Sequence, residues 1–454
     1  MSRRNKGSIA PLLIMLALIG GSLFIYFSSM FERDAPEISM QTNGYWNLKK
    51  PLGITISDES GVKSYKIIMK TSKEEKILQY EQLITAQNLL TLEVKPPRNT
   101  HSLKDKNIKI IVEASDISKW NMLHGNMSKK VFKLVIDKRR PKLNILANSY
   151  KISRGGSALV IFKAEDENIE KLYIQGNDGK EFIPEPFYKD GYFISLLAWP
   201  VVDENFKATV IATDKAGNVS RSYIPLYLKQ KNYKISNIKL SDKFLKGKIA
   251  ELAEDFVETE GVDNSLEQFK IINEDIRAKN EMLIHKLTSK VESKKINNFK
   301  INRMYPLKNA QVVAHFGDHR KYFYDGEKIS EAYHLGLDLA SNAMAAIKPQ
   351  NSGEVVFNDD NGLYGNMLSI SYGLGLYSIF GHCSSIKVNV GDITKKREVV
   401  ANTGKSGYAM GDHLHFGVLV QGIEVRPQEW MDKQWIKLNI NDVIKSAKRI
   451  IDRD

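Results

Sequence analysis

Cysteine is almost absent from this 454-residue chain, in which Cys383 stands alone. A single cysteine excludes an intramolecular disulfide, a cysteine-based zinc finger and a cysteine-ligated iron–sulfur cluster. The nine histidines are therefore the candidate soft ligands for a metal. Six of them lie between residues 315 and 415, and this concentration favours a metal site in that part of the chain.

A concentrated basic segment is also missing, although the chain carries a net charge of +13. Residues 304–433 hold 12 Lys and Arg against 14 Asp and Glu, so the positive excess lies mostly upstream of the histidine-rich part. Nucleic-acid-binding proteins present a basic face with interleaved aromatic residues, and no such pattern is found. We therefore expect no nucleic-acid partner.

Long hydrophobic runs are scarce, with one exception near the start of the sequence. The uncharged run from Gly7 to Phe31 is long enough to cross a bilayer as a helix. Arg3, Arg4 and Lys6 precede it, and positive charge on that side places the N-terminus in the cytoplasm. This pattern predicts a single transmembrane helix with the bulk of the chain outside the cytoplasm.

The hydrophobic run lacks a clear small-residue cleavage site, the nearest candidate being Gly20 to Ser22. This favours a retained signal anchor over a cleaved signal peptide, and the lack of a nearby cysteine excludes a lipoprotein. The absence of disulfides and of wall-binding repeats fits a Gram-negative envelope. We expect residues 1–33 to be a cytoplasmic stub and anchor in the inner (cytoplasmic) membrane, with the bulk in the periplasm.

The next two segments, residues 34–137 and 138–232, resemble two copies of one unit. Two pairs of acidic residues end matching strand-like segments at spacings of about 100 residues: Asp58 with Asp166, and Asp116 with Asp214. Short alternating strands with Asn, Asp and Gly turns predict tandem β-sandwiches of immunoglobulin-like type. Because His101 and His124 are isolated, we expect spacers, or modules that dock envelope proteins, and no catalytic cluster.

Residues 238–300 change to a helical pattern. A first apolar stripe begins after Ser241, Gly261 interrupts it, and Asn264 can cap a second helix. We expect a helical hairpin or neck, with His285 in a packing or surface role. Residues 301–433 are Gly-rich and predict short strands, and residues 434–454 predict a short basic helix. A hairpin that precedes a cleft could also cover it and keep an enzyme latent.

Two short motifs in the β-rich segment carry metal-binding residue types. His334 and Asp338 alternate with apolar residues and are predicted to face one side of a strand, with Gly336 leaving room for an ion between them. His413 and His415 follow the same logic. Zinc takes imidazole nitrogen and carboxylate oxygen, and a catalytic site uses three protein ligands with an open fourth position.

Each motif alone is weak, because any strand that contains histidine can produce it. Together, and with His382 in the same segment, they predict a metal site. One His–Asp pair and one histidine of the second motif complete the ligand set, and the remaining histidine is free for acid–base work. The pattern leaves open which of His413 and His415 is the ligand.

About 125 residues, from Tyr305 to Pro427, resemble the lysostaphin/LytM-type zinc endopeptidases. The motif order matches throughout: Phe316-Gly-Asp-His-Arg320, His334-Leu-Gly-Leu-Asp338, Gly353-Glu-Val, Tyr364-Gly-Asn, Tyr377-Ser-Ile-Phe-Gly-His382, Thr403-Gly-Lys-Ser-Gly407 and His413-Leu-His-Phe. The resemblance implies an all-β LytM-type domain that binds one Zn²⁺ per chain. It also implies that His334, Asp338 and His415 are the zinc ligands, and that His382 and His413 are the catalytic pair.

Other nucleophiles are not supported by the sequence. Cys383 follows His382, and adjacent strand residues face opposite sides, so the two cannot form a nucleophile–base pair; we expect Cys383 to be buried. The segment around Ser406 lacks the G-x-S-x-G spacing of a serine hydrolase. His315 and His319 lie near the predicted site, where a surface position is expected.

The resulting architecture is mainly β and multidomain: anchor, two sandwiches, helical neck, C-terminal peptidase domain and tail helix. The resemblance implies a zinc endopeptidase that hydrolyses stem peptides or cross-links of peptidoglycan, as a D,D-endopeptidase or carboxypeptidase, to remodel the cell's own wall. Two alternatives are a LytM-like adaptor that activates another wall hydrolase and an immunoglobulin-module scaffold for envelope proteins. Because all five site positions are present, activity is expected.

Overall fold

The computed structural model describes residues 9–98, 103–177 and 179–454, so Arg3, Arg4, Lys6 and His101 lie outside the described residues. The contacts divide the chain into two compact units. One comprises residues 1–141 with the short segments 168–170 and 213–219, and the other comprises the rest of residues 142–454. Among the described residues the chain is mainly β, with one apolar N-terminal helix, which confirms the predicted fold class.

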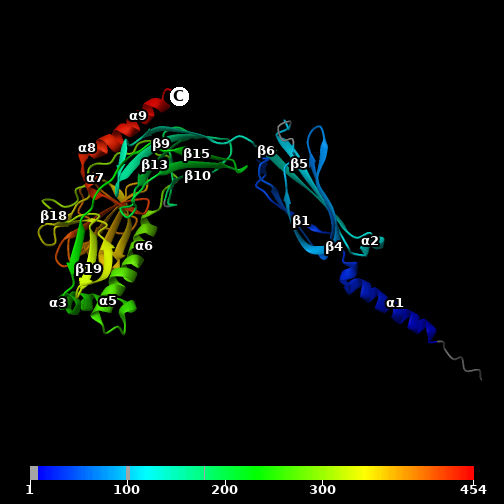
Figure 1. The fold of residues 1–454 in the computed structure, drawn as a ribbon, viewed down its shortest axis with the longest axis horizontal. Coiled ribbons are helices and arrows are strands. Elements are labelled where there is room, and N and C mark those ends of the chain that lie inside the picture. The colour runs from blue at the N-terminus through cyan, green and yellow to red at the C-terminus, as the bar shows by residue number, and fades with distance from the viewer. Residues whose placement is uncertain (1–8, 99–102, 178) are drawn as a thin grey trace, which may run out of the picture. The chain divides into compact units, whose positions relative to one another are not determined.

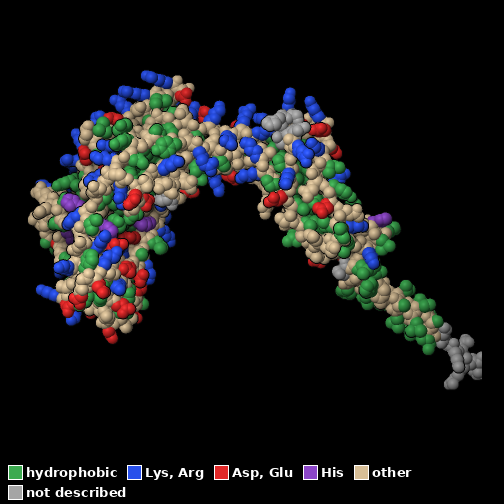
Figure 2. Space-filling model, in the orientation of Figure 1, with side chains coloured by type: hydrophobic (Ala, Val, Ile, Leu, Met, Phe, Trp, Pro, Cys, Tyr) green, Lys and Arg blue, Asp and Glu red, His purple; other side chains and the backbone are tan. Residues whose placement is uncertain are grey.

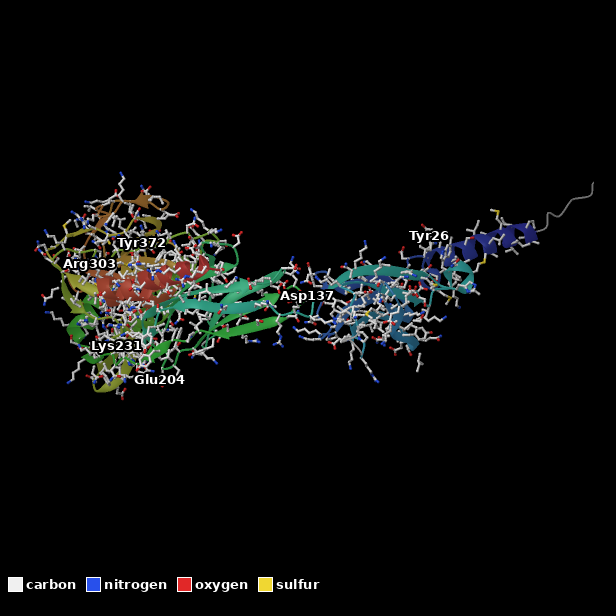
Figure 3. The ribbon with its side chains drawn as sticks, turned by 90° about the horizontal axis from the view of Figure 1, so that it is seen from above. Tyr26, Asp137, Glu204, Lys231, Arg303 and Tyr372 are labelled. Carbon is white, nitrogen blue, oxygen red and sulfur yellow. The ribbon has the colours of Figure 1, made fainter. Side chains whose placement is uncertain are left out.

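Helix α1 (Ala10–Phe27) forms the central part of the predicted hydrophobic run (Figure 1). None of its 18 residues is buried, and its side chains, Tyr26 among them, project away from the ribbon (Figure 3). By length and composition it can cross a membrane. The guanidinium of Arg33 lies 5.1 Å from the centre of the Tyr26 ring.

The first repeat forms one hydrogen-bonded sheet with strand order β1-β3-β5-β6-β2, to which β4 adds beside β3. The sheet is continuous because β3 is 19 residues long, and its two halves pair with β1 and β5. Its strands are β1 (Glu37–Gln41), β2 (Tyr45–Trp46), β3 (Leu52–Lys70), β4 (Glu75–Val94), β5 (Asn107–Asp116) and β6 (Met127–Ile136), with the short helix α2 (Trp120–Leu123) before β6. Its core contains Ile54, Tyr65 and Ile110.

The second repeat has two four-stranded sheets instead, with orders β11-β10-β14-β15 and β12-β13-β9-β7. They are built from β7 (Lys142–Asn148), β9 (Ser157–Glu165), β10 (Ile169–Gly176), β11 (Glu181–Phe182), β12 (Glu185–Pro186), β13 (Tyr192–Ala198), β14 (Ala208–Asp214) and β15 (Val219–Tyr223), while β8 (Lys151–Ser153) pairs with β16 (Tyr227–Lys229). At the strand end singled out in the sequence, the Asp214 carboxylate accepts hydrogen bonds from Asn218, as the Asp116 carboxylate does from Asn126. The immunoglobulin-like assignment of both repeats stays a prediction.

The helical segment folds as two continuous helical stretches that pack on the C-terminal β-structure (Figure 1). The stretches are α3 (Asp242–Phe244) to α4 (Ala250–Ala253), and α5 (Ser265–Ile271) to α6 (Arg277–Thr288), each joined by a π-helical turn. The side chains of Ser241 and Asn264 cap them, as the sequence indicates. Their apolar faces share one core with strands of the histidine-rich segment, so the hairpin is a wall of that domain rather than a free neck.

The histidine-rich segment is built on an eight-stranded sheet with order β18-β21-β29-β25-β24-β23-β27, and β30 adds beside β29. A parallel strand β17 (Ile235–Lys239) extends the small sheet of β19 (His319–Tyr324) and β20 (Glu327–Tyr333), and a third sheet joins β22 (Ala346–Ile347), β28 (Ala401–Asn402) and β26 (Ser385–Ile386). The large sheet comprises β18 (Gln311–Ala314), β21 (Leu337–Ala340), β23 (Gly353–Asp360), β24 (Asn366–Ser371), β25 (Leu376–Gly381), β27 (Ile393–Thr394), β29 (Leu414–Val420) and β30 (Ile423–Val425). Phe380 and Phe416 stack in its core.

The chain ends in three short helices, α7 (Pro427–Met431), α8 (Lys433–Ile436) and α9 (Asp442–Ile451). They pack on the second repeat: the Trp430 indole N–H donates to the Ser157 hydroxyl, and the Ser149 hydroxyl donates to the Asn439 carbonyl. The tail helix α9 therefore belongs to the packed structure of the second unit, where its residues Val443, Ile444, Ala447 and Ile451 are buried.

Candidate metal centre and catalytic cleft

Three neighbouring strands of the large sheet place the predicted site residues side by side. Strand β29 lies between β21 and β25, and in this register Asp338 on β21 and Gly381 on β25 both lie opposite His415. His382 follows Gly381 directly, and His413 precedes β29. Strand pairing thus brings together Asp338 and His415, which are 77 positions apart in sequence.

His334, Asp338 and His415 converge on one point. Nε2 of His334 lies 3.0 Å from Oδ1 of Asp338 and 3.2 Å from Nδ1 of His415, and that Nδ1 lies 2.9 Å from the same oxygen. All three residues are buried. Such a group of one carboxylate and two imidazole nitrogens could hold a metal ion.

A backbone carbonyl fixes the orientation of the first histidine. Nδ1 of His334 donates a hydrogen bond to the carbonyl oxygen of His315, 2.9 Å away, so its Nε2 turns a lone pair toward Asp338. His315 therefore contributes through its backbone, while its side chain is exposed as predicted. On His415, the buried Nε2 has no hydrogen-bond partner among the described residues, and the Tyr364 ring packs edge-on against the imidazole.

Two details differ from the sequence prediction. His334 lies before β21 and not on it, so a loop, rather than strand alternation, brings it beside Asp338. Gly336 makes room for an imidazole and not for an ion, because a Cβ atom built there would lie 2.4 Å from the His415 ring. A side chain at position 336 would therefore displace His415.

His382 and His413 stand next to this group, with ring centres 4.7 Å apart. Each donates from Nδ1 to a backbone carbonyl, that of Ser406 or that of Gly411, at 2.8 Å. Nε2 of His413 then lies 3.7 Å from Oδ2 of Asp338. These hydrogen bonds leave the Nε2 atoms free to exchange protons with a bound molecule.

The backbone of His382 adopts a left-handed conformation with φ of 61°. Non-glycine residues seldom take this conformation, which costs about 1–3 kcal/mol and recurs at functional sites. It also changes the reasoning about Cys383, because strand β25 ends at Gly381 and strand alternation does not apply beyond it. The expected outcome holds for another reason: Cys383 is fully buried, and burial raises the pKa of its thiol to about 12.

The site combines a charged carboxylate, that of Asp338, with two neutral imidazoles, those of His382 and His415. Burial alone would raise the pKa of Asp338, but the charge of His334 and hydrogen bonds from both histidines hold it well below its usual value. Burial, aided by His415 and His413, lowers the pKa of His382 to about 3. Burial also lowers the pKa of His415, against the opposing effect of Asp338. At neutral pH, His382 and His415 are therefore neutral.

All five predicted residues line one cleft of about 420 Å³. Histidine side chains are visible on the surface of this unit (Figure 2). Sequence reasoning missed several lining residues: Arg277, Arg320, Tyr364, Tyr408 and Asp412. Arg320 could have been predicted, because it is the last residue of the motif that begins at Phe316. Arg277 belongs to the helical hairpin, and no sequence motif around it indicates a role in the cleft. Of the described residues in 238–300, Arg277 alone lines this cleft.

The remaining described histidines lie away from the metal group. His319 stacks on Tyr333 and pairs with Glu331 at 3.1 Å. His285, at the end of α6, contacts the Glu424 carboxylate at 2.9 Å and so helps to hold the hairpin on the sheet. His124 is exposed beside α2.

Residues 332–427 match the model of peptidase family M23. DD-carboxypeptidase/endopeptidase Mpg of Neisseria meningitidis serogroup B is 28% identical over 94 residues, which cover 21% of this chain and 22% of that protein. Murein hydrolase activator EnvC of Escherichia coli is 28% identical over 98 residues, which cover 22% of this chain and 23% of that protein. The chain thus spans less than a quarter of the length of either relative.

Among solved structures, the catalytic domain of the antimicrobial peptidase lysostaphin from Staphylococcus simulans is similar at 23% identity and a TM-score of 0.23, covering 27% of this chain and 92% of that chain. The family match confirms the resemblance inferred from the motifs. It includes His334, Asp338, His382, His413 and His415. The C-terminal part of the chain therefore carries a peptidase family M23 domain.

Proposed function

We propose that this protein is a zinc-dependent peptidoglycan endopeptidase with D,D-endopeptidase specificity, anchored by α1 in the inner membrane with its bulk in the periplasm. The observation that carries the proposal is the convergence of two imidazole nitrogens and a carboxylate oxygen beside a second histidine pair. In this setting the enzyme trims the cell's own wall. The name of the relative Mpg, a DD-carboxypeptidase/endopeptidase, agrees with the proposed bond class.

The donor set fits zinc. Zinc takes ligands at about 2.0–2.2 Å in a tetrahedron, so two of its ligand atoms lie roughly 3.3 Å apart. The three atoms offered by His334, Asp338 and His415 are 2.9–3.2 Å apart. Two of the three ligand atoms are imidazole nitrogens and only one is a carboxylate oxygen, which favours zinc over magnesium or calcium. One bound zinc would keep a fourth position for water.

The chain's own residues then supply proton transfer. Zinc held by His334, Asp338 and His415 would lower the pKa of a bound water to about 7 and would polarise the scissile carbonyl. The Nε2 atom of one imidazole of the His382–His413 pair would accept the proton of the attacking water and pass it to the amine nitrogen that leaves as the C–N bond breaks. The Nε2–H of the other, when protonated, would donate a hydrogen bond to the developing oxyanion. The carbonyls of Ser406 and Gly411 accept from Nδ1–H of the two rings, so each Nε2 can accept a proton when its ring is neutral and donate one when its ring is protonated.

A catalytically silent adaptor is the main alternative, because one similar protein is named as a murein hydrolase activator. An adaptor needs neither metal ligands nor an acid–base pair. This chain keeps all five residues, and a buried carboxylate shared by two imidazoles is costly to maintain without a bound cation. The completeness of the site favours the enzyme.

Muropeptide release by the full-length chain in detergent tests the proposal. The wild type is compared with His334→Ala, His382→Ala and the control His124→Ala, whose side chain is exposed and does not line the cleft. We expect about one zinc per wild-type chain, loss of zinc and activity in His334→Ala, and loss of activity alone in His382→Ala, by about a hundredfold or more. Metal binding without cleavage by the wild type would favour the adaptor.

A further inference from the structure

Two arginines lie in the same cleft as the histidines, and neither belongs to the matched segment 332–427. Arg277 is the first residue of α6 in the helical hairpin, and Arg320 lies on β19. Both are partly buried. Water-shielded guanidinium groups are the side chains best suited to bind carboxylates, because their N–H groups form a planar fork.

Neutral groups hold Arg277 in place. Its Nε donates to the Asn273 carbonyl at 3.2 Å, and its Nη2 donates to the Asn273 side-chain oxygen at 3.0 Å. Asn273 is itself buried and donates to the Ser330 hydroxyl at 2.8 Å. The guanidinium is thus oriented by amide oxygens from the π-helical turn before α6, which leave its charge without compensation.

Arg320 is only loosely paired. Its Nε lies 3.8 Å from Oδ2 of Asp318, beyond hydrogen-bond distance, and both oxygens of that carboxylate also accept from the Ser236 hydroxyl. Burial raises the pKa of the nearby Tyr408 phenol, and the charges of Arg277 and Arg320 both act against that rise. Both arginines therefore lie within electrostatic reach of one hydroxyl in the cleft wall.

The carboxylates that line the cleft, Asp338 and Asp412, already interact with other residues. Asp338 lies between His334 and His415, and Asp412 accepts from the Thr403 hydroxyl and from the Met344 backbone N–H. Glu281, one helical turn after Arg277, has a pKa raised to about 7 by burial and by Glu424, so it carries only part of a charge at neutral pH. The cleft therefore has two cationic groups whose charges are not fully compensated.

We propose that Arg277 and Arg320 form a carboxylate-binding subsite that recognises a free carboxylate on the peptide substrate beside the scissile bond. The inference rests on the proposed function, because it names the substrate class of the same cleft: peptides with a free carboxylate, as opposed to amidated ones. In this proposal, a residue of the helical hairpin, outside the matched segment 332–427, discriminates between free and amidated peptides. Arg277 approaches the peptide from α6, and Arg320 approaches it from β19.

The test uses the zinc-loaded full-length chain and a synthetic D,D-cross-linked peptide, prepared with free carboxylates and with the same groups amidated. We expect amidation to lower the wild-type kcat/KM by about tenfold or more, since charge-assisted hydrogen bonds are lost. Arg277→Gln should lower kcat/KM by a similar factor for the free form, mainly through KM, and leave the amidated form nearly unchanged. Arg277→Lys should be intermediate, because charge remains and the fork is lost.

The control is Lys286→Gln, which removes one positive charge from an exposed position of the same helix outside the cleft. It should behave as the wild type on both peptides. The inference is overturned if amidation leaves the wild-type kcat/KM unchanged, or if Arg277→Gln slows both peptides equally, as a purely structural role would require.

Equilibrium binding separates this inference from the proposed function. If the wild type cleaves neither peptide, the endopeptidase assignment fails, and the Kd values of the same two peptides decide about the subsite. Tighter binding of the free form that is lost in Arg277→Gln supports the subsite in a protein that only binds wall peptides. Equal Kd values for the free and amidated peptides would show that Arg277 and Arg320 do not form a carboxylate-binding subsite.

Discussion

The two walls of the cleft differ in origin and in chemistry. One wall comes from residues 332–427 and holds the five histidine and aspartate side chains proposed for metal binding and proton transfer. The other comes from the helical hairpin and β19, and contributes Arg277 and Arg320. The matched segment thus holds the residues proposed for metal binding and proton transfer, while elements outside it contribute the two arginines. Substitutions in the two walls should therefore have different effects on zinc content, turnover and stability.

The largest effect is expected from Asp338→Asn in the family wall. The amide is nearly isosteric but uncharged, and it cannot replace the carboxylate oxygen that meets both imidazoles. We expect zinc content to fall below half and turnover of wall peptides to fall by about a thousandfold. Zinc analysis and turnover are measured on the same sample; retained zinc with normal turnover would contradict the ligand assignment.

Gly336→Ala should have the next largest effect. The added Cβ would lie 2.4 Å from the His415 ring, so the imidazole must move. Misplacement by about 1 Å can cost a hundredfold in rate, and we expect a loss of that order together with weaker zinc binding. Gly247→Ala is the control, because position 247 has open space for a Cβ, has no positive φ and does not line the cleft. Similar behaviour of both variants would exclude the steric explanation.

Asn280→Ala probes how the hairpin wall is attached. The Asn280 side-chain oxygen accepts from the Leu363 backbone N–H at 2.9 Å, next to Tyr364 in the cleft. Loss of this acceptor leaves a partly buried N–H unpaired, which costs about 1–3 kcal/mol in the free energy of unfolding. Denaturant unfolding measures this cost, with the exposed neighbour Lys279→Ala as control. Zinc content should stay unchanged, in contrast to the family-wall variants.

Much of the family wall could be predicted from sequence. The His334–Asp338 and His413–His415 spacings bring ligands to neighbouring strands, and the pairing of Asp338 with His415 agrees with that expectation. Two local features could not be predicted. A loop places His334 beside Asp338, and no sequence pattern indicates the left-handed backbone of His382. Backbone geometry of this kind depends on the surrounding packing, which residue spacing does not encode.

The hairpin wall was less predictable. Its apolar periodicity and the caps at Ser241 and Asn264 indicate helices, but periodicity does not say which surface the apolar face covers. In the structure this apolar face packs on strand β19 at Tyr322 and on the turn that contains Leu363. Arg277 lines the cleft as a consequence of that packing, although it lies 57 residues before His334, the first residue of the motif that predicts the site. Such long-range placement cannot be derived from a local pattern.

The smallest effect is expected from Glu281→Gln, which acts between the two walls. Burial and the charge of Glu424 raise the pKa of Glu281 from 4.5 to about 7 in the folded chain, against the opposing charges of Arg277 and His285. A raised pKa means that the folded state binds the proton more tightly than the unfolded state does. Its contribution to stability is therefore complete below about pH 4.5 and is lost as the pH rises through 7. At pH 8, wild-type Glu281 is charged in a partly buried position.

A neutral glutamine at position 281 avoids the cost of burying a charged carboxylate at pH 8. We expect Glu281→Gln to raise the free energy of unfolding by about 1–2 kcal/mol at pH 8 and to change it little at pH 5. Denaturant titrations at both pH values measure the difference, with the exposed Glu251→Gln as control for the loss of one negative charge. An equal gain at both pH values would show that shape rather than ionisation is responsible. A gain confined to pH 8 would show that ionisation of Glu281 destabilises the folded chain.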